Sequence, residues 1–148
     1  MGIRTIIFRG KRVDNGNWVE GYLVKLGRES FSDPERYGVC NKAIPLGGSG
    51  VCYNLKIDEV IPETVEQYTG LTDKNGKKIF EGDILSFSDR LVYVNWHDYC
   101  GCWDCSYIKA VNGKATLHED RGPNKWRYNA VVVGNIHDNP ELLKVGDK

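Results

Sequence analysis

The stretch VIPETVEQYTGLTDKNGKKIFEGDILSF, residues 60–87, carries the turn signals from which the predicted fold is built outward in both directions. Pro62 takes the first position of an expected helix of one or two turns, where its missing N–H costs nothing, and Gly70 stands where the residue after such a helix belongs. Asn75-Gly76 is a strong short turn signal. Glu81-Gly82-Asp83 then turns the chain into a new strand. This order of short helix, hairpin and strand predicts the start of a small SH3-like barrel.

Short apolar runs separated by glycine turns continue outward from this segment. Residues 91–96 form the clearest expected strand, because they are β-branched and aromatic, and Asn139-Pro140 predicts a second short helix. The sequence therefore predicts an all-β fold with two short helices. An N-terminal β-hairpin and sheet region, residues 1–61, would pack on a partly open SH3-like β-barrel, residues 62–148, as one compact unit overall. The other expected strands are residues 6–9, 18–26, 37–44, 51–61, 106–111, 114–118 and 126–133.

The amino-acid composition narrows the classes of protein to which the chain can belong. The chain has 148 residues, 41% of them hydrophobic, with 20 basic and 20 acidic residues and therefore no net charge. A chain without basic excess lacks the overall field that drives non-specific nucleic-acid binding, although a local basic patch is compatible with it. No apolar run reaches the ~18–20 residues that span a bilayer. Arg4 and Arg9 bracket only four residues, too few for the apolar core of a signal peptide. We therefore expect a cytoplasmic protein with no membrane partner, whose five cysteines are thiols.

Several short blocks follow one another along the chain: FRGK at residues 8–11, NGNWVEGY at 15–22, VIPETV at 60–65, QYTGL at 67–71, DKNG at 73–76, IFEGDI at 79–84 and VGNIHDNPELL at 133–143. Together these blocks resemble the YopX family of phage and prophage proteins. The resemblance implies a small, mainly β protein of the host-cell cytoplasm, with a barrel-like C-terminal part and self-association. It implies no enzyme activity, because the family has no assigned catalytic residues.

A cysteine-bearing loop, HDYCGCWDC at residues 97–105, is the best chemical candidate and lies outside the family pattern. His97, Cys100, Cys102 and Cys105 supply the four nitrogen and sulfur ligands that zinc prefers. Structural zinc sites usually join two separated pairs of ligands, whereas these four crowd into nine residues. The favoured interpretation is therefore a loop of exposed or half-buried thiols. A redox pair of Cys102 and Cys105 is a weaker alternative.

Two further pairs of residues invite a functional interpretation. A hairpin centred near residues 46 and 47 would place Cys40 opposite Cys52, as a disulfide or half of a metal site, but two small buried side chains are the simpler interpretation. Glu81 and Asp83 could form a pair of acid–base carboxylates, but Asp83 is more simply a turn residue that accepts backbone N–H bonds. His118 and His137 are isolated in the sequence, and we interpret both as surface or structural histidines.

Basic residues gather at Lys74, Lys77 and Lys78, in the expected hairpin turn. A small β-barrel with basic loops and exposed aromatic side chains is a common platform for single-stranded nucleic acid. Acidic residues interleave with these lysines, so a solvated surface of mixed charge is the favoured interpretation.

The leading functional hypothesis is a non-enzymatic phage or prophage accessory protein that needs no cofactor. It would act through self-association, as a homo-oligomer, and through binding of an unidentified protein partner. A nucleic-acid-binding module of phage replication or transcription is the first alternative, and a zinc-binding structural module is the second.

Overall fold

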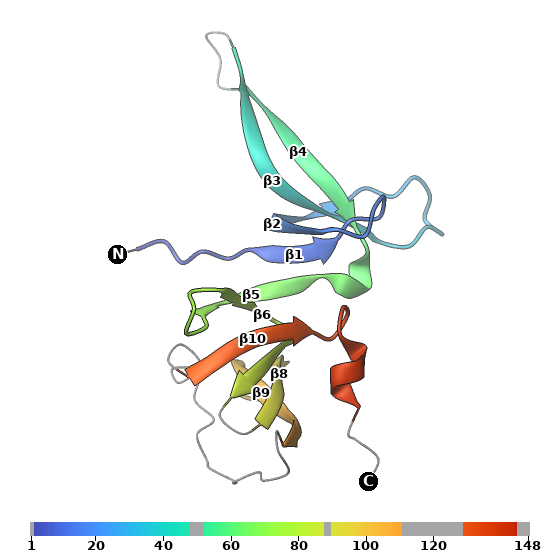
Figure 1. The fold of residues 1–148 in the computed structure, drawn as a ribbon. Coiled ribbons are helices and arrows are strands. Elements are labelled where there is room, and N and C mark those ends of the chain that lie inside the picture. Colours follow the sequence, from blue (N-terminus) through green and yellow to red (C-terminus); the bar gives the residue numbers. More distant parts are fainter. Residues whose placement is uncertain (1, 48–51, 88–89, 111–128, 145–148) are drawn as a thin grey trace. The chain divides into compact units, whose positions relative to one another are not determined.

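A computed structural model of the protein describes residues 2–47, 52–87, 90–110 and 129–144 (Figure 1). Nearly all of its regular structure is strand, and every strand pairing is antiparallel. Two short 3₁₀ turns, η1 and η3, stand where the two short helices are predicted. The all-β class is thereby confirmed, while the SH3-like form of the barrel stays a prediction. No helix among the described residues is long and apolar enough to cross a membrane.

The chain divides into two compact units, residues 1–67 and 68–148, whereas the predicted boundary lies after Ile61. In the first unit the strands are paired in the order β4-β3-β2-β1-β5, and only the first residues of β5 belong to it. Its elements are β1 (Phe8–Lys11), β2 (Trp18–Leu26), β3 (Arg36–Leu46), β4 (Cys52–Val60), η1 (Pro62–Thr64) and the start of β5 (Glu66–Thr72).

The helix expected between Pro62 and Gly70 is much shorter than predicted. It begins at Pro62 as expected but ends after one 3₁₀ turn at Thr64, and β5 follows. The Thr64 hydroxyl accepts the backbone N–H of Lys11 at 2.8 Å, which ties the turn to β1. Gly70, with a φ of +85°, lies where the pairing of β5 with its neighbour shifts register rather than at a helix end. Strand pairing with β1 thus overrides the local helix signal.

A buried ion pair fixes the start of β5 to β1. Arg9 Nε donates to Glu66 Oε2 at 2.6 Å, and both side chains are almost fully buried. The Arg9 guanidinium also lies 4.6 Å from the centre of the Trp18 ring, within range of a cation–π interaction. Removing one partner of such a buried pair is costly, because it leaves the other charge without compensation in a dry site.

The second unit contains a four-stranded sheet in the order β10-β7-β8-β9. Its largest hydrophobic cluster includes Ile79, Leu85 and Val94, and a smaller cluster is built around Ile84. Ile84 and Leu85 are adjacent in β7 and therefore point to opposite faces of the sheet, which is why each joins a different cluster. The remaining elements are β6 (Lys78–Phe80), β7 (Asp83–Phe87), β8 (Arg90–His97), β9 (Cys102–Ala110), β10 (Ala130–Asn135) and η3 (Pro140–Leu143).

Some predicted elements fall outside the described residues. This applies to the expected strand at 114–118, to His118 and to residues 126–128 of the expected last strand. From Ala130 onward, that last strand is present as β10.

Asp73 joins the turn between β5 and β6 to β10. Its Oδ1 accepts the backbone N–H groups of Asn75 and Lys77 at 2.8 and 2.9 Å, and its Oδ2 accepts that of Val132 at 3.0 Å. Burial by itself raises the pKa of Asp73, but the three hydrogen bonds together outweigh burial and lower the pKa below its usual value. The ionised carboxylate is therefore part of the folded structure.

We predict that Asp73→Asn lowers the free energy of unfolding by about 1–3 kcal/mol at neutral pH, because an amide offers only one acceptor oxygen. The folded-state pKa lies below the unfolded value of about 3.9, so the stabilisation is present above that pH and is lost as the pH falls through the folded pKa. The difference in urea midpoint between the wild type and the variant should therefore shrink below about pH 4. A difference that stays constant down to acidic pH would contradict this role.

Candidate binding surface

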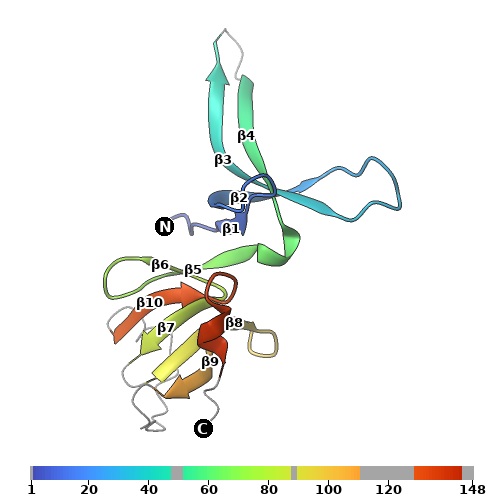
Figure 2. The same cartoon turned by 45° about the vertical axis from the view of Figure 1, so that its right-hand side comes forward.

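The distal halves of β3 and β4 form a two-stranded ribbon that extends beyond β1 and β2 within the first unit (Figures 1 and 2). We call residues 42–46 and 52–57 the distal ribbon. All of these residues are exposed. Their register places Ala43 opposite Leu55 and Pro45 opposite Tyr53.

One face of the distal ribbon is apolar. Directly opposite residues of an antiparallel pair project from the same face, so the register defines this face residue by residue. Tyr53 and Leu55 are 55% and 52% exposed, although both are large hydrophobic side chains. The face continues past the ribbon onto β2, where Tyr22 pairs with Cys40 and is 65% exposed. The apolar face consists of Tyr22, Cys40, Ala43, Pro45, Tyr53, Leu55 and Ile57.

The opposite face of the distal ribbon is more polar near its root. Lys42 and Lys56 face one another across the strands, and Asn54 lies opposite Ile44. Toward the tip this second face also carries Ile44 and Leu46, which are 42% and 52% exposed, so the two faces differ in chemistry mainly near the root.

β4 is also the end strand of the sheet. Its outer edge is bridged at the root, where Arg12 pairs with Val60 and Val13 N–H donates to Glu59 O at 3.0 Å, whereas no described strand pairs with that edge along residues 52–57.

The root of the ribbon is held firmly. The Arg36 guanidinium binds the Glu59 carboxylate through two hydrogen bonds: Nε donates to Oε1 at 2.7 Å and Nη2 donates to Oε2 at 2.6 Å. These hydrogen bonds lower the pKa of the Glu59 carboxyl. The Asn41 amide donates to the nearly buried Asp58 at 3.1 Å. Val39 is fully buried in the same region. A hydrogen-bonded base with a buried Val39 thus carries the exposed ribbon.

The two cysteines expected to face one another across this hairpin do not do so. Cys40 pairs with Ile57 and Cys52 pairs with Leu46, because the hairpin is centred several residues later than predicted and a bulge follows Cys40. All five cysteines are unbridged thiols, as the sequence predicts.

The four residues proposed as zinc ligands are not brought together. Cys102 and Cys105 are three residues apart in β9 and therefore project from opposite faces of the strand. Cys105 packs against the hydrophobic core, whereas Cys100 and Cys102 are exposed. In the described part of the chain, no group of three or more His, Cys, Asp or Glu side chains is arranged to hold a metal ion.

The carboxylate pair at Glu81 and Asp83 is a turn motif. Asp83 is buried, and its Oδ2 accepts the backbone N–H of Phe80 at 2.8 Å, which is the structural role favoured from the sequence. Gly82, with a φ of +75°, donates its N–H to Val94 O at 2.8 Å and accepts the N–H of Ile136 at 2.9 Å. This corner therefore joins β8 to the segment that follows β10.

Lys74, Lys77 and Lys78 are all exposed and lie around the single turn between β5 and β6. The buried Asp73 carboxylate shapes this turn by accepting backbone N–H groups from it. The structure thus brings the three predicted nucleic-acid-binding lysines together.

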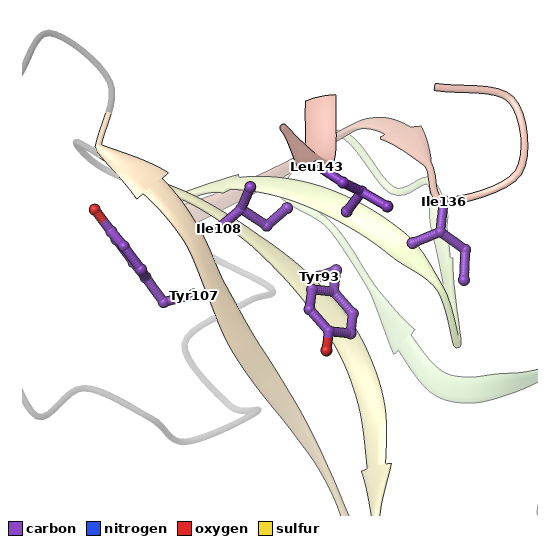
Figure 3. A pocket seen from close by; sticks show the side chains of 5 residues that line it. All are labelled: Tyr93, Tyr107, Ile108, Ile136 and Leu143. Atoms are coloured by element: carbon purple, nitrogen blue, oxygen red, sulfur yellow. The ribbon is translucent and has the colours of Figure 1, made fainter. Parts of the chain in front are cut away.

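A shallow hollow of about 420 Å³ lies in the second unit, a feature that sequence reasoning missed (Figure 3). Its lining consists of two tyrosines and three aliphatic side chains, which suits apolar groups rather than acid–base chemistry. Tyr107 lies on the far side of β9 from the other four side chains in Figure 3. The lining residues are Tyr93, Tyr107, Ile108, Ile136 and Leu143.

We predict that Gly21→Ala destabilises the root of the ribbon. A Cβ at Gly21 would lie 2.2 Å from the carbonyl oxygen of Cys40, so β2 and β3 would have to separate. Overpacking of this kind costs about 1–3 kcal/mol, which denaturant unfolding would measure. Gly27→Ala is the matched control, because nothing lies within 4 Å of a Cβ there. Equal stability of the two variants would show that β2 and β3 are not packed this closely.

Comparison with known proteins extends over nearly the whole chain. A family model described as "YopX protein" matches residues 7–144. Among solved structures, the chain is similar to protein EF1440 from Enterococcus faecalis, with a TM-score of 0.54 and 25% sequence identity over 95% of this chain and 99% of that chain. No curated protein matches the chain.

Proposed function

The chain belongs to the YopX family, and from this premise we propose that it is a non-enzymatic phage or prophage accessory protein that acts through self-association and protein binding. The observation that carries the proposal is the exposed apolar face of the distal ribbon. Large patches of this kind on soluble proteins mark interaction sites. The proposal places the protein in the cytoplasm of the host cell.

Energetics favour a covered ribbon. An isolated two-stranded hairpin is marginally stable in water, because neither of its faces has a layer to pack against. Full burial of a side chain such as Leu55 contributes about 1.5–3 kcal/mol to the free energy of association. In a symmetric dimer both copies use the same surface, so each buried residue contributes twice. Contacts that bury part of Tyr53, Leu55 and Ile57 in two copies therefore favour association, and a protein partner packed on the same face would bury the rest.

A second copy of the chain fits the outer edge of β4. In an antiparallel β4–β4 pair centred on Leu55, each Leu55 meets its own copy, and Tyr53 lies opposite Ile57 of the other chain. The apolar faces of the two ribbons then form one continuous surface, in which cross-strand neighbours contact one another and the rest is left for a protein partner. Lys56 lies opposite Asn54 in this register, so no lysine faces another lysine across the symmetry axis. The absence of net charge on the chain removes overall repulsion between copies.

The polar residues of the family blocks support a non-enzymatic role. Asp73 and Asp83 use their carboxylates to accept backbone N–H groups within turns. Asn135 does the same, since its Oδ1 accepts the N–H groups of His137 and Asp138 at 3.0 and 2.9 Å. These side chains stabilise turns of the fold, so their presence in the family blocks has a structural explanation that requires no catalytic role.

We predict that the wild type sediments above its monomer mass of 16.7 kDa at micromolar concentration and that Leu55→Asp sediments as a monomer. The substitution would place two carboxylates against one another at the symmetry axis. Sedimentation velocity measures both species.

Asn54→Asp is the matched control, because this neighbouring residue projects from the other face and lies opposite Lys56 of the second copy. We expect this variant to stay associated and to become more stable at low salt. A monomeric wild type, or equal loss of association in both variants, would contradict the proposal.

A second candidate function rests on the lysines of the β5–β6 turn. Three exposed lysines on one turn of a β protein form a local basic patch, which suits the phosphate backbone of a single-stranded nucleic acid. The candidate partner class is single-stranded DNA or RNA, as in a module of phage replication or transcription.

For this second candidate, charge reversal at Lys77 and Lys78 should weaken binding of a fluorescent oligonucleotide and flatten its salt dependence. Fluorescence anisotropy at low and moderate salt measures both effects. Reversal of Lys42 and Lys56 on the distal ribbon is the control with the same charge change. Undetectable binding by the wild type at low salt would eliminate this function.

A further inference from the structure

The loop between β2 and β3 carries the most exposed large hydrophobic side chain in the part of the chain that the structure describes. We call residues 27–35 the Phe31 loop; it projects from the first unit (Figures 1 and 2). Phe31 lies at its centre and is fully exposed. The Asp33 N–H donates to Ser30 O at 3.2 Å, and Asp33 Oδ2 accepts the Ser30 N–H at 2.8 Å. Phe31 and Ser32 are therefore the central residues of a hydrogen-bonded β-turn, which holds the ring in solvent.

One carboxylate joins the two ends of the Phe31 loop. Glu35 Oε1 accepts hydrogen bonds from Lys25 Nζ at 2.5 Å and from Arg28 Nη2 at 2.7 Å, and Glu35 Oε2 accepts one from the Tyr37 hydroxyl at 2.7 Å. Lys25 and Tyr37 lie opposite one another on β2 and β3. A loop that is held at its base and its tip loses less conformational freedom when it binds. Aromatic side chains are enriched at protein interfaces, so this loop is suited to binding.

The hollow of the second unit has the chemistry and the size to take an aromatic ring. Ile108 is buried and Leu143 is 36% exposed, so its lining runs from the core to the surface. Tyr93, Ile108, Ile136 and Leu143 lie on one side of β9 in Figure 3. The volume of about 420 Å³ is ample for a phenyl ring, since an apolar cavity of about 150 Å³ holds benzene. Tyr93 also offers the ring an aromatic neighbour.

Exposed charges of opposite sign accompany the loop and the hollow. Glu29 of the Phe31 loop forms no hydrogen bond or salt bridge with any residue that the structure describes. Lys144 directly follows Leu143, and its ammonium group likewise has no partner among the described residues. Glu141, on the same segment, accepts a hydrogen bond from the Asn139 amide at 3.2 Å. The loop contains three acidic residues and one basic residue, so its charge complements the lysine beside the hollow.

We propose that the Phe31 loop of one copy docks into the hollow of a second copy. The Phe31 ring would lie among Tyr93, Ile136 and Leu143, and Glu29 would lie beside Lys144. The two surfaces differ, so a pair of copies keeps one free loop and one free hollow. Such a heterologous contact continues from copy to copy as an open chain unless it closes into a ring. It goes beyond the β4 pairing proposed above and does not depend on it.

This contact is weak for an isolated pair of chains. Burial of one phenyl ring contributes less free energy than the loss of translational and rotational freedom costs, so micromolar protein would not associate through it alone. Copies that are already paired through β4 would carry two loops and two hollows, and multiple contacts would strengthen one another. The test therefore uses several hundred micromolar protein and the Leu55→Asp background, which is designed to lack the β4 pairing.

Photo-cross-linking locates the contact. Phe31 is replaced by p-benzoylphenylalanine in the Leu55→Asp chain, and equal amounts of unlabelled and isotope-labelled protein are mixed and irradiated. We expect cross-linked peptides that join position 31 to the hollow and that combine one labelled with one unlabelled chain. The same group in place of Ile3, which is 99% exposed, is the control and should not select the hollow. Cross-links within one chain only, equal cross-linking of the hollow from both positions, or none from position 31 to the hollow would overturn the proposal.

Sedimentation equilibrium in the same background measures the strength of the contact. Phe31→Ser should weaken association about tenfold or more, because the buried ring is lost, whereas Ile3→Ser should leave it unchanged. Glu29→Lys and Lys144→Glu should each weaken association about two- to fivefold, and both substitutions together should restore it, because the charges are exchanged. These side chains are exposed, and circular dichroism checks that each variant is folded.

Equal association of Phe31→Ser and its parent, or no recovery in the chain with both charge substitutions, would overturn the proposal. Both measurements use a chain without the β4 contact, so their failure would leave the proposed function standing. Failure of the β4 pairing in the wild type would likewise leave these measurements valid.

Discussion

A two-stranded ribbon cannot cover its own side chains, and this constraint shapes the account of the first unit. β3 and β4 continue beyond the strands that flank them, and their distal residues place Tyr53 and Leu55 in solvent. An apolar face of this kind is stable only when something packs against it. We therefore propose that a second copy pairs with the outer edge of β4 and that a protein partner covers the joined apolar face.

The root of the ribbon would help to make the proposed association specific. Arg36 and Glu59 form a two-pronged ion pair across β3 and β4, and the close approach at Gly21 holds β2 against β3. A ribbon with a fixed base loses little conformational freedom when it binds, and this reduces the cost of association. Its rigidity and its exposed apolar face together suit a binding protein.

Much of the fold could be predicted from the sequence, because turn chemistry is local. Asn75-Gly76 makes the expected turn, and Asp83 accepts a backbone N–H as expected of a turn carboxylate. The helix after Pro62 was predicted too long, because the pairing of Glu66 with Arg9 is a contact between residues far apart in the chain. Local propensity carries no information on such a contact.

The binding surface was harder to predict. The strands that carry Ala43 and Leu55 alternate in the same way whether a face is buried or exposed, so the sequence shows the face but not what covers it. The bulge after Cys40 and a later hairpin centre moved Cys40 and Cys52 out of register. In the cysteine loop, the odd spacing of Cys102 and Cys105 along β9 places two of the expected ligands on opposite faces of the strand.

Hydrogen exchange of the β4 amides tests the central claim most directly, because a second copy would cover the outer edge of this strand. We expect the amides of residues 52–57 to exchange slowly in a concentrated sample and to lose that protection on strong dilution, while the buried strands of the second unit stay unchanged. Rapid exchange of these amides at the highest concentration, equal to that of the diluted protein, would contradict the account.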